Sequence, residues 1–195
     1  MMFRLAAPLG LLLALGQATA LAADAPAPAP VPAPTPAPAP LKTVERDRII
    51  IAGQPGALDL EQLRQQGVVG VFNLRTDTEM ADRAQVPYDE ATLARELGFD
   101  YVQEPVGGTD HPFRPEVLAA FKAQLDRSEG KILLHCATGG RAGLLYAAYA
   151  VKYLGQQPDE AMRSLESLGG WPLPLERLTG IPLKVERREA EAAPR

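Results

Sequence analysis

Short apolar segments alternate with amphipathic ones along most of this chain, and this alternation constrains the fold more than any other feature. Segments rich in β-branched or aromatic residues have the length of buried strands. They lie at 49–51, 68–74, 99–103 and 131–135. Segments with helical periodicity lie at 58–66, 89–97, 115–127, 142–154 and 158–168. Strands that alternate with helices predict an α/β sandwich with a mostly parallel central sheet flanked by helices.

Ligands of such folds bind beyond the carboxyl ends of the strands, and this rule selects three loops. These loops follow Leu74, Gln103 and His135. The first, 75–87, is polar and is expected to be irregular, and the second contains the glycine-bearing stretch 105–112.

The N-terminal residues have the pattern of a secretory signal peptide. Arg4 precedes an apolar run from Leu5 to Gly16, and small residues follow it. The run is shorter than the roughly 20 residues that span a bilayer, so we expect cleavage and no stable membrane anchor afterwards. We therefore predict a signal peptide at 1–22 and a periplasmic or secreted protein.

An alanine- and proline-rich stretch follows and separates the signal peptide from the folded part. Proline fixes φ and lacks an N–H group, so residues 23–43 are expected to form a disordered, extended linker. The catalytic domain is predicted at 44–182, and a charged C-terminal tail at 183–195.

The charge balance and the residue counts exclude several classes of function. Twenty Lys and Arg against 24 Asp and Glu give a net charge of −4, which argues against nucleic-acid binding. The single cysteine, Cys136, excludes an intramolecular disulfide and a Cys-rich zinc site. Two histidines, His111 and His135, leave little for a histidine-based metal centre. We expect neither a metal nor a cofactor.

The loop after the strand at 131–135 carries the strongest chemical signal. The small residues Ala137, Thr138, Gly139 and Gly140 separate Cys136 from Arg141, and a long apolar helix follows. Such a loop can turn its N–H groups inward, toward the positive end of the helix. Arg141 adds a forked donor suited to an oxyanion, and these groups together favour the nucleophilic thiolate of Cys136. His135 is a supporting residue that could orient the loop through hydrogen bonds to its backbone. The alternative to this catalytic interpretation is that Cys136 is an inert core cysteine and that the glycines form a simple turn.

The stretch His135-Cys136-x-x-Gly139-x-Arg141 resembles the active-site loop of Cys-dependent protein-tyrosine and dual-specificity phosphatases. It is more similar still to the bacterial beta-lactamase-hydrolase-like phosphatase-like family. That resemblance also includes Ala52–Pro55 and the segment from Gly67-Val68 to Asn73–Arg75. The resemblance covers about residues 46–170. It implies a protein-tyrosine-phosphatase-like sandwich and a phosphocysteine formed on Cys136. Arg141 and the N–H groups of residues 137–140 would bind the phosphate of a phosphorylated protein or a small molecule.

The spacing of the loop leaves the chemistry open. Four residues separate Cys136 from Arg141, whereas most tyrosine phosphatases have five, and Ala142 stands at the usual arginine position. The shorter spacing occurs in the bacterial family, some of whose members are described as sulfur transferases, and in rhodanese-type sulfurtransferases. One alternative is therefore sulfur transfer from a donor to an acceptor thiol through a Cys136 persulfide. Another is a non-catalytic module that holds an anion.

A phosphatase also needs a general acid for its leaving group. The resemblance places it in the loop after 99–103, where Asp110 is the best match and His111 is the rival. Asp110 could instead cap a turn before Pro112. The acidic residues at 77, 79 and 82 occupy another loop at the rim and are expected to be solvated.

Overall fold

The computed structural model describes residues 40–163 and 175–182, which contain a five-stranded sheet with the order β1-β2-β5-β3-β4. The strands are β1 (Thr43–Arg46), β2 (Ile49–Ala52), β3 (Val68–Asn73), β4 (Asp100–Gln103) and β5 (Lys131–His135). β2, β5, β3 and β4 pair in parallel, and only β1 runs antiparallel, beside β2. The mostly parallel sheet is therefore confirmed.

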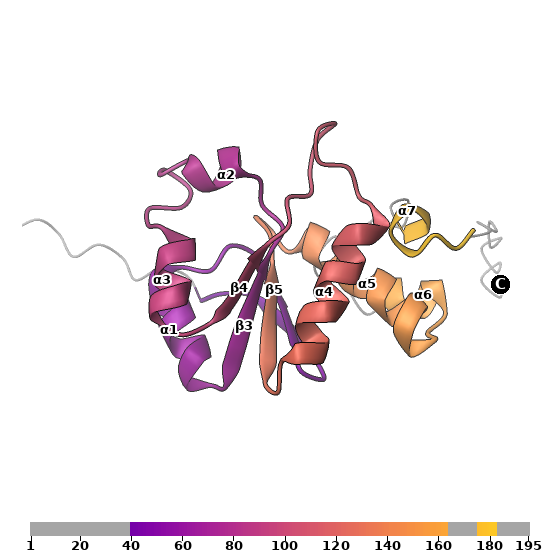
Figure 1. The fold of residues 1–195 in the computed structure, drawn as a ribbon, viewed down its shortest axis with the longest axis horizontal. Coiled ribbons are helices and arrows are strands. Elements are labelled where there is room, and N and C mark those ends of the chain that lie inside the picture. Colours follow the sequence, from indigo (N-terminus) through magenta and orange to yellow (C-terminus); the bar gives the residue numbers. More distant parts are fainter. Residues whose placement is uncertain (1–39, 164–174, 183–195) are drawn as a thin grey trace, which may run out of the picture. The chain divides into compact units, whose positions relative to one another are not determined.

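Helices cover both faces of this sheet (Figure 1). On one face lie α1 (Ala57–Gln65) and α3 (Glu90–Glu96), and on the other lie α4 (Pro115–Arg127) and α5 (Gly140–Leu154). Two short helices, α6 (Pro158–Arg163) and α7 (Leu175–Thr179), pack against α5. The α/β sandwich expected from the sequence is thus the observed architecture.

The period of two in the strands divides the buried residues between two cores. In β2, Ile49 and Ile51 belong to the core under α4 and α5, while Ile50 and Ala52 belong to the core under α1 and α3. Because β2 lies between helices on both sides, all four of its residues are buried. This explains why the strand reads as a continuous apolar run.

Three elements were not expected from the sequence. β1 alternates exposed and half-buried residues and forms a polar edge strand, so its apolar signal is weak. α2 (Asp77–Ala81) lies within 75–87, where we expected irregular structure. α7 is only five residues long, too short for periodicity to reveal. α5 begins at Gly140, two residues before the predicted start.

Several sequence predictions fall on residues outside the described ranges. These are the signal peptide at 1–22, most of the linker at 23–43, the C-terminal tail, and the helical prediction for 164–168. Thr43, the last residue of the predicted linker, is the first residue of β1. Within the described ranges, no helix has both the length and the apolar character needed to cross a membrane.

Candidate active site

The parallel strands bring the ends of three segments together around Cys136. In the register of the sheet, His135 at the end of β5 lies beside Ala52 of β2 and Asn73 of β3. The residues that follow these strands therefore meet at one edge of the sheet, as parallel pairing requires. They are Gly53 and Gln54, Leu74 and Arg75, and the loop from Cys136 to Gly139.

The backbone of the Cys136 loop faces the sulfur. Gly139 has a left-handed conformation, with φ 96°, and its N–H donates to the Sγ of Cys136 over 3.2 Å. An L side chain rarely adopts this φ, so a glycine is required here. Cys136 is only 1% exposed and lies just before α5, whose N-terminus adds positive potential. The N–H group and the helix end thus both place positive partial charge next to the sulfur.

The other small residues hold the loop against its neighbours. The N–H of Gln54 donates to the carbonyl of Ala137 over 3.0 Å. A Cβ on Gly53 would lie 3.1 Å from that same carbonyl oxygen, so the two segments need a glycine to approach this closely. Thr138 is exposed, and Gly140 begins α5.

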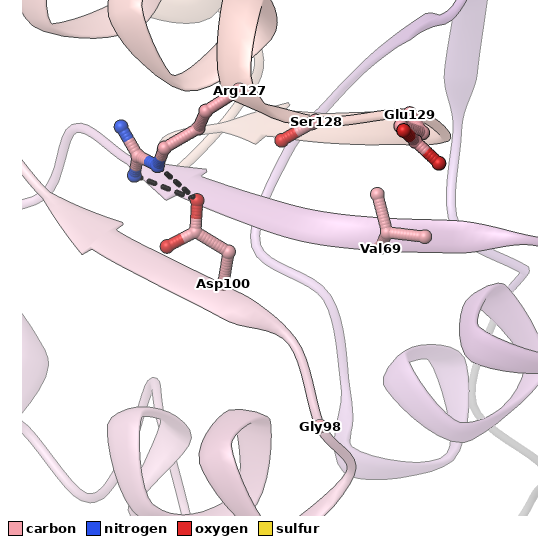
Figure 2. A pocket seen from close by; sticks show the side chains of 6 residues that line it. All are labelled: Val69, Gly98, Asp100, Arg127, Ser128 and Glu129. Carbon is pink, nitrogen blue, oxygen red and sulfur yellow. Dashed lines mark hydrogen bonds and ion pairs between the residues drawn. The ribbon is translucent and has the colours of Figure 1, made fainter.

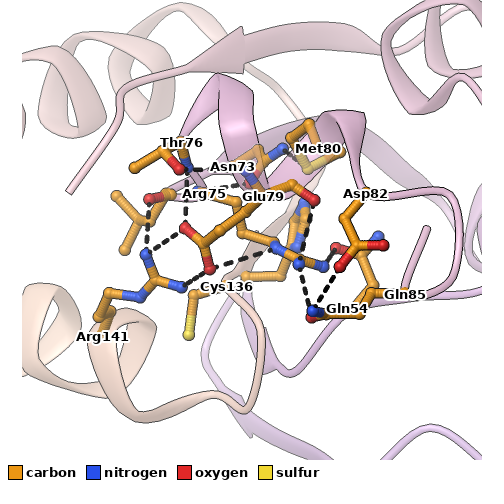
Figure 3. Close-up of polar contacts among 12 residues, drawn as sticks. Gln54, Asn73, Arg75, Thr76, Glu79, Met80, Asp82, Gln85, Cys136 and Arg141 are labelled. Atoms are coloured by element: carbon orange, nitrogen blue, oxygen red, sulfur yellow. Dashed lines mark hydrogen bonds and ion pairs between the residues drawn. The ribbon is translucent and has the colours of Figure 1, made fainter. Parts of the chain in front are cut away.

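Arg141 lies beside Cys136 and is held by three other segments. Its Nη1 donates to the carbonyl of Val106 over 2.5 Å and to that of Leu74 over 3.4 Å. Its two terminal nitrogens donate to the carboxylate of Glu79 over 2.9 and 2.6 Å (Figure 3). The hydrogen bonds that Arg141 donates to Glu79, together with the charge interactions with Cys136 and Glu79, raise the pKa of Arg141 against the effect of burial. The guanidinium is thus a fixed cation at the mouth of the loop.

Glu79 corrects the expectation that the acidic residues of this loop are solvated. Its backbone N–H donates to the Oγ1 of Thr76, and the N–H of Thr76 donates to its Oε2, which caps α2 and aims the carboxylate at Arg141. Burial opposes ionisation of Glu79, but the hydrogen bonds from Arg141 and Thr76 and the nearby arginine charges outweigh it. They lower its pKa from 4.5 to about 2. The capping pattern Thr76-x-x-Glu79 was visible in the sequence, but the partner was not.

His135 makes a contact that the sequence did not predict. Its Nε2 lies 3.0 Å from the Oε1 of Glu90, and both side chains are 0% exposed. Its other ring nitrogen, Nδ1, has no hydrogen-bond partner among the described residues. The side chain therefore contacts Glu90, and the expected hydrogen bonds to the loop backbone are not among those formed in the described part of the chain.

The loop that carries Asp110 is anchored to the site at its base. Gly107 donates to the carbonyl of His111 over 2.7 Å, which closes a narrow turn around Asp110. Val106, next to this turn, accepts the hydrogen bond from Arg141. Asp110 itself is exposed and forms no hydrogen bond to Cys136 or Arg141 within the described residues. Its role as general acid stays a prediction.

Two further observations concern the rest of the surface. A shallow hollow lies at the amino ends of the strands, between β3, β4 and the end of α4 (Figure 2). Arg127 and Asp100, which both line this hollow, form an ion pair of 2.6 Å. The hollow lies at the opposite edge of the sheet from Cys136 and is not part of its site. Across the described ranges, no group of three or more His, Cys, Asp or Glu side chains is placed to hold a metal ion.

A cysteine between a central parallel strand and a buried helix, with an arginine in the first turn, defines a phosphatase-like domain of the Cys-dependent kind. The chain belongs to the family described as beta-lactamase hydrolase-like protein, phosphatase-like domain, whose model matches residues 41–152. A beta-lactamase hydrolase-like protein from Xylella fastidiosa (strain Temecula1) is 33% identical over 123 residues, which are 63% of this chain and 27% of that protein. The chain thus spans about a quarter of the length of this curated relative.

Solved structures share the fold. A candidate phosphatase from Shewanella putrefaciens CN-32 is 26% identical, with a TM-score of 0.55, over 72% of this chain and 88% of that one. The active form of Tk-PTP is 21% identical, with a TM-score of 0.52, over 63% of this chain and 80% of that one. The protein-tyrosine-phosphatase-like fold expected from the resemblance is confirmed.

Proposed function

We propose that this domain hydrolyses phosphomonoesters through a phosphocysteine on Cys136. The observation that carries the proposal is the hydrogen bond of 3.2 Å from Gly139 to the Sγ of Cys136, beside the guanidinium of Arg141. The N–H group supports a sulfur anion, and the arginine supports the charge on the oxygens of a phosphoryl group. These are the two requirements of nucleophilic attack on phosphorus.

The reaction has two steps. The thiolate attacks phosphorus, an S–P bond forms, and the P–O bond to the leaving group breaks with its electron pair on oxygen. Asp110 donates a proton to that oxygen. Water then attacks the phosphocysteine and gives a proton to the Asp110 carboxylate, the S–P bond breaks with its electron pair on sulfur, and the thiolate and inorganic phosphate are released. Arg141 and the loop N–H groups bind the equatorial oxygens in both steps.

A second candidate, sulfur transfer, is favoured by one observation. Only four residues separate Cys136 from Arg141, so the loop is shorter than in most tyrosine phosphatases. A short loop suits a single sulfur atom on Cys136. The thiolate would accept that atom from thiosulfate, releasing sulfite, and an acceptor thiol or cyanide would remove it. We further propose a periplasmic or secreted location, with phosphorylated proteins or small molecules, or alternatively sulfur donors and acceptor thiols, as substrates.

A side-by-side assay of the purified chain separates the two chemistries. We expect release of p-nitrophenol from p-nitrophenyl phosphate and no thiocyanate from thiosulfate and cyanide. Cys136→Ser should abolish the activity, and Glu96→Gln, on an exposed position of α3, should leave it unchanged. Turnover of thiosulfate alone would overturn the proposal in favour of sulfur transfer, and turnover of neither substrate would favour the anion-binding module.

The role of Asp110 is tested by the choice of leaving group. p-Nitrophenolate leaves readily without a proton, whereas phenolate needs one. Asp110→Asn should therefore lower kcat on phenyl phosphate by roughly 100-fold, the scale of a general acid, and lower kcat on p-nitrophenyl phosphate much less. Equal losses on the two esters would exclude Asp110 as the acid. The same comparison with His111→Asn tests its rival.

A further inference from the structure

Glu90 is a fully buried carboxylate that the proposed reaction does not use. It is the first residue of α3, it precedes His135 by 45 positions, and its side chain is 0% exposed. Burying a charge is costly unless several hydrogen bonds compensate for it. Five side chains, each from a different segment of the chain, lie within hydrogen-bond distance of Glu90. They are Gln54, Asn73, Tyr88, Tyr101 and His135.

Arg75 determines the direction of two of these hydrogen bonds. Its Nη1 can only donate, and it lies 2.7 Å from the Oε1 of Gln54. The amide nitrogen of Gln54 therefore points the other way and donates to the Oε2 of Glu90 over 2.5 Å. In the same manner the backbone N–H of Arg75 donates to the Oδ1 of Asn73, so the Nδ2 of Asn73 donates to Glu90 over 3.1 Å.

Tyr101 also donates to Glu90, over 3.3 Å. The hydroxyl of Tyr88 donates to the carbonyl of Pro55 over 2.8 Å and lies 3.4 Å from the Oε2 of Glu90. Burial, with the charge of Glu90, raises the pKa of Tyr88 and of Tyr101, so both hydroxyls keep their protons. Burial of Glu90 opposes its ionisation, but His135 and the surrounding donors outweigh it and lower its pKa. An ionised Glu90 has no proton to give. The Nε2 of His135, 3.0 Å away, must then carry the hydrogen of their contact.

The consequence reaches Cys136 through the chain. His135 is the residue before Cys136, and its ring is oriented by Glu90 at the floor of the site. Gln54, whose amide is oriented by the same carboxylate, donates its backbone N–H to Ala137 on the far side of the cysteine. The residues on both sides of the nucleophile are thus tied to a single buried acceptor.

We propose that Glu90 is a positioning residue that holds His135 with a hydrogen on Nε2 and thereby fixes Cys136 for attack. The effect of Glu90 on kcat rests on the proposed function, whereas the position of the hydrogen on His135 does not. Glu90 does not touch the substrate in this proposal. It acts through the imidazole, as outer partners of functional histidines do.

The tautomer of His135 can be measured in the unaltered protein. The chain has two histidines, so a ¹⁵N spectrum of the imidazole nitrogens contains two sets of signals, and His111→Asn assigns the remaining set to His135. We expect the Nε2 of His135 to carry a hydrogen. A His135 signal with a bare Nε2 and a hydrogen on Nδ1 would overturn the proposal, whatever activity the protein has.

The kinetic test uses Glu90→Gln, with Glu96→Gln on the same helix as the matched control. Glutamine has nearly the same volume, but its amide group would face the donors of Gln54 or Asn73. We expect kcat on p-nitrophenyl phosphate to fall by roughly 10- to 100-fold, the scale of losing a partner that orients a histidine. In a His135→Asn background the same substitution should change kcat less than threefold, because its effect passes through His135.

The outcomes are distinguishable from failure of the proposed function. If Glu90→Gln lowers kcat as much in the His135→Asn background as in the parent chain, action through the imidazole is refuted. An unchanged kcat in Glu90→Gln would refute the proposal altogether. If the parent chain turns over only thiosulfate, the proposed function fails, and the same cycle is measured on sulfur transfer. If Glu90→Gln does not fold, the ¹⁵N measurement on the parent chain still decides.

Discussion

We predict that the ion pair between Glu79 and Arg141 stabilises the folded state by an amount that depends on pH. Replacing Glu79 by Gln removes a carboxylate whose pKa is lowered from 4.5 to about 2. At 1.36 kcal/mol per pKa unit, a shift of this size corresponds to roughly 3 kcal/mol in favour of the folded state at neutral pH. Glu79 is 29% exposed, so solvent screening reduces this value, and we expect Glu79→Gln to cost about 1–2 kcal/mol at pH 7.

The sign of the pH dependence follows from the lowered pKa. A carboxylate of this kind stabilises the folded state fully above its ordinary pKa and loses that contribution as the pH falls through its folded value. The difference between the parent chain and Glu79→Gln should therefore shrink from pH 5 downward, and at pH 3 it should be less than half of its value at pH 7. Other carboxylates titrate equally in both proteins, so their contributions cancel in the difference.

Urea unfolding, followed by circular dichroism from pH 7 to pH 3, measures this difference. Glu96→Gln is the matched control, because it removes an exposed carboxylate from another helix and should change stability by less than about 0.5 kcal/mol. A cost for Glu79→Gln that stays constant between pH 7 and pH 3 would refute the assignment to the ion pair. So would a cost no larger than that of the control.

Two further substitutions test the loop and the core. Gly139→Ala places a Cβ on a residue with φ 96° and should lower stability by about 1–2 kcal/mol, measured as a drop in Tm. It should also reduce kcat by disturbing the N–H that faces Cys136, and an unchanged kcat would show that this hydrogen bond does not matter. Phe121→Ala removes a fully buried ring that packs edge-to-face on Phe72 and Tyr149. Its expected cost is about 3–5 kcal/mol in urea unfolding, and a cost below 1 kcal/mol would contradict the packing described.

The parts of the fold that the sequence predicted are those with a local signal. β2, β3 and β5 are apolar because helices bury both of their faces. α4 has apolar residues at helical spacing, and these residues pack in the core. β1 was missed because an edge strand needs few apolar residues. α7 was missed because five residues do not complete a pattern.

The candidate site likewise has a part with a local sequence signal, which was predicted, and a part without one, which was not. The residues from His135 to Arg141 are contiguous, so strand, small loop and helix were readable together. Glu79 and Glu90 lie 62 and 45 positions from Arg141 and His135, and no local pattern predicts these partners. Their role depends on strand order, which places the ends of β2, β3 and β5 side by side. Long-range partners of this kind require the tertiary structure.

The order of the strands also determines when this site can form during synthesis. β2 and β3 are not neighbours in the sheet, because β5 lies between them and pairs with both. A nascent chain that ends before Lys131 therefore has two strands without their common partner, and contacts between distant segments form slowly. The nucleophile follows that last strand directly. Such a nascent chain therefore lacks both the strand that joins the two halves of the sheet and the loop that would bind an anion.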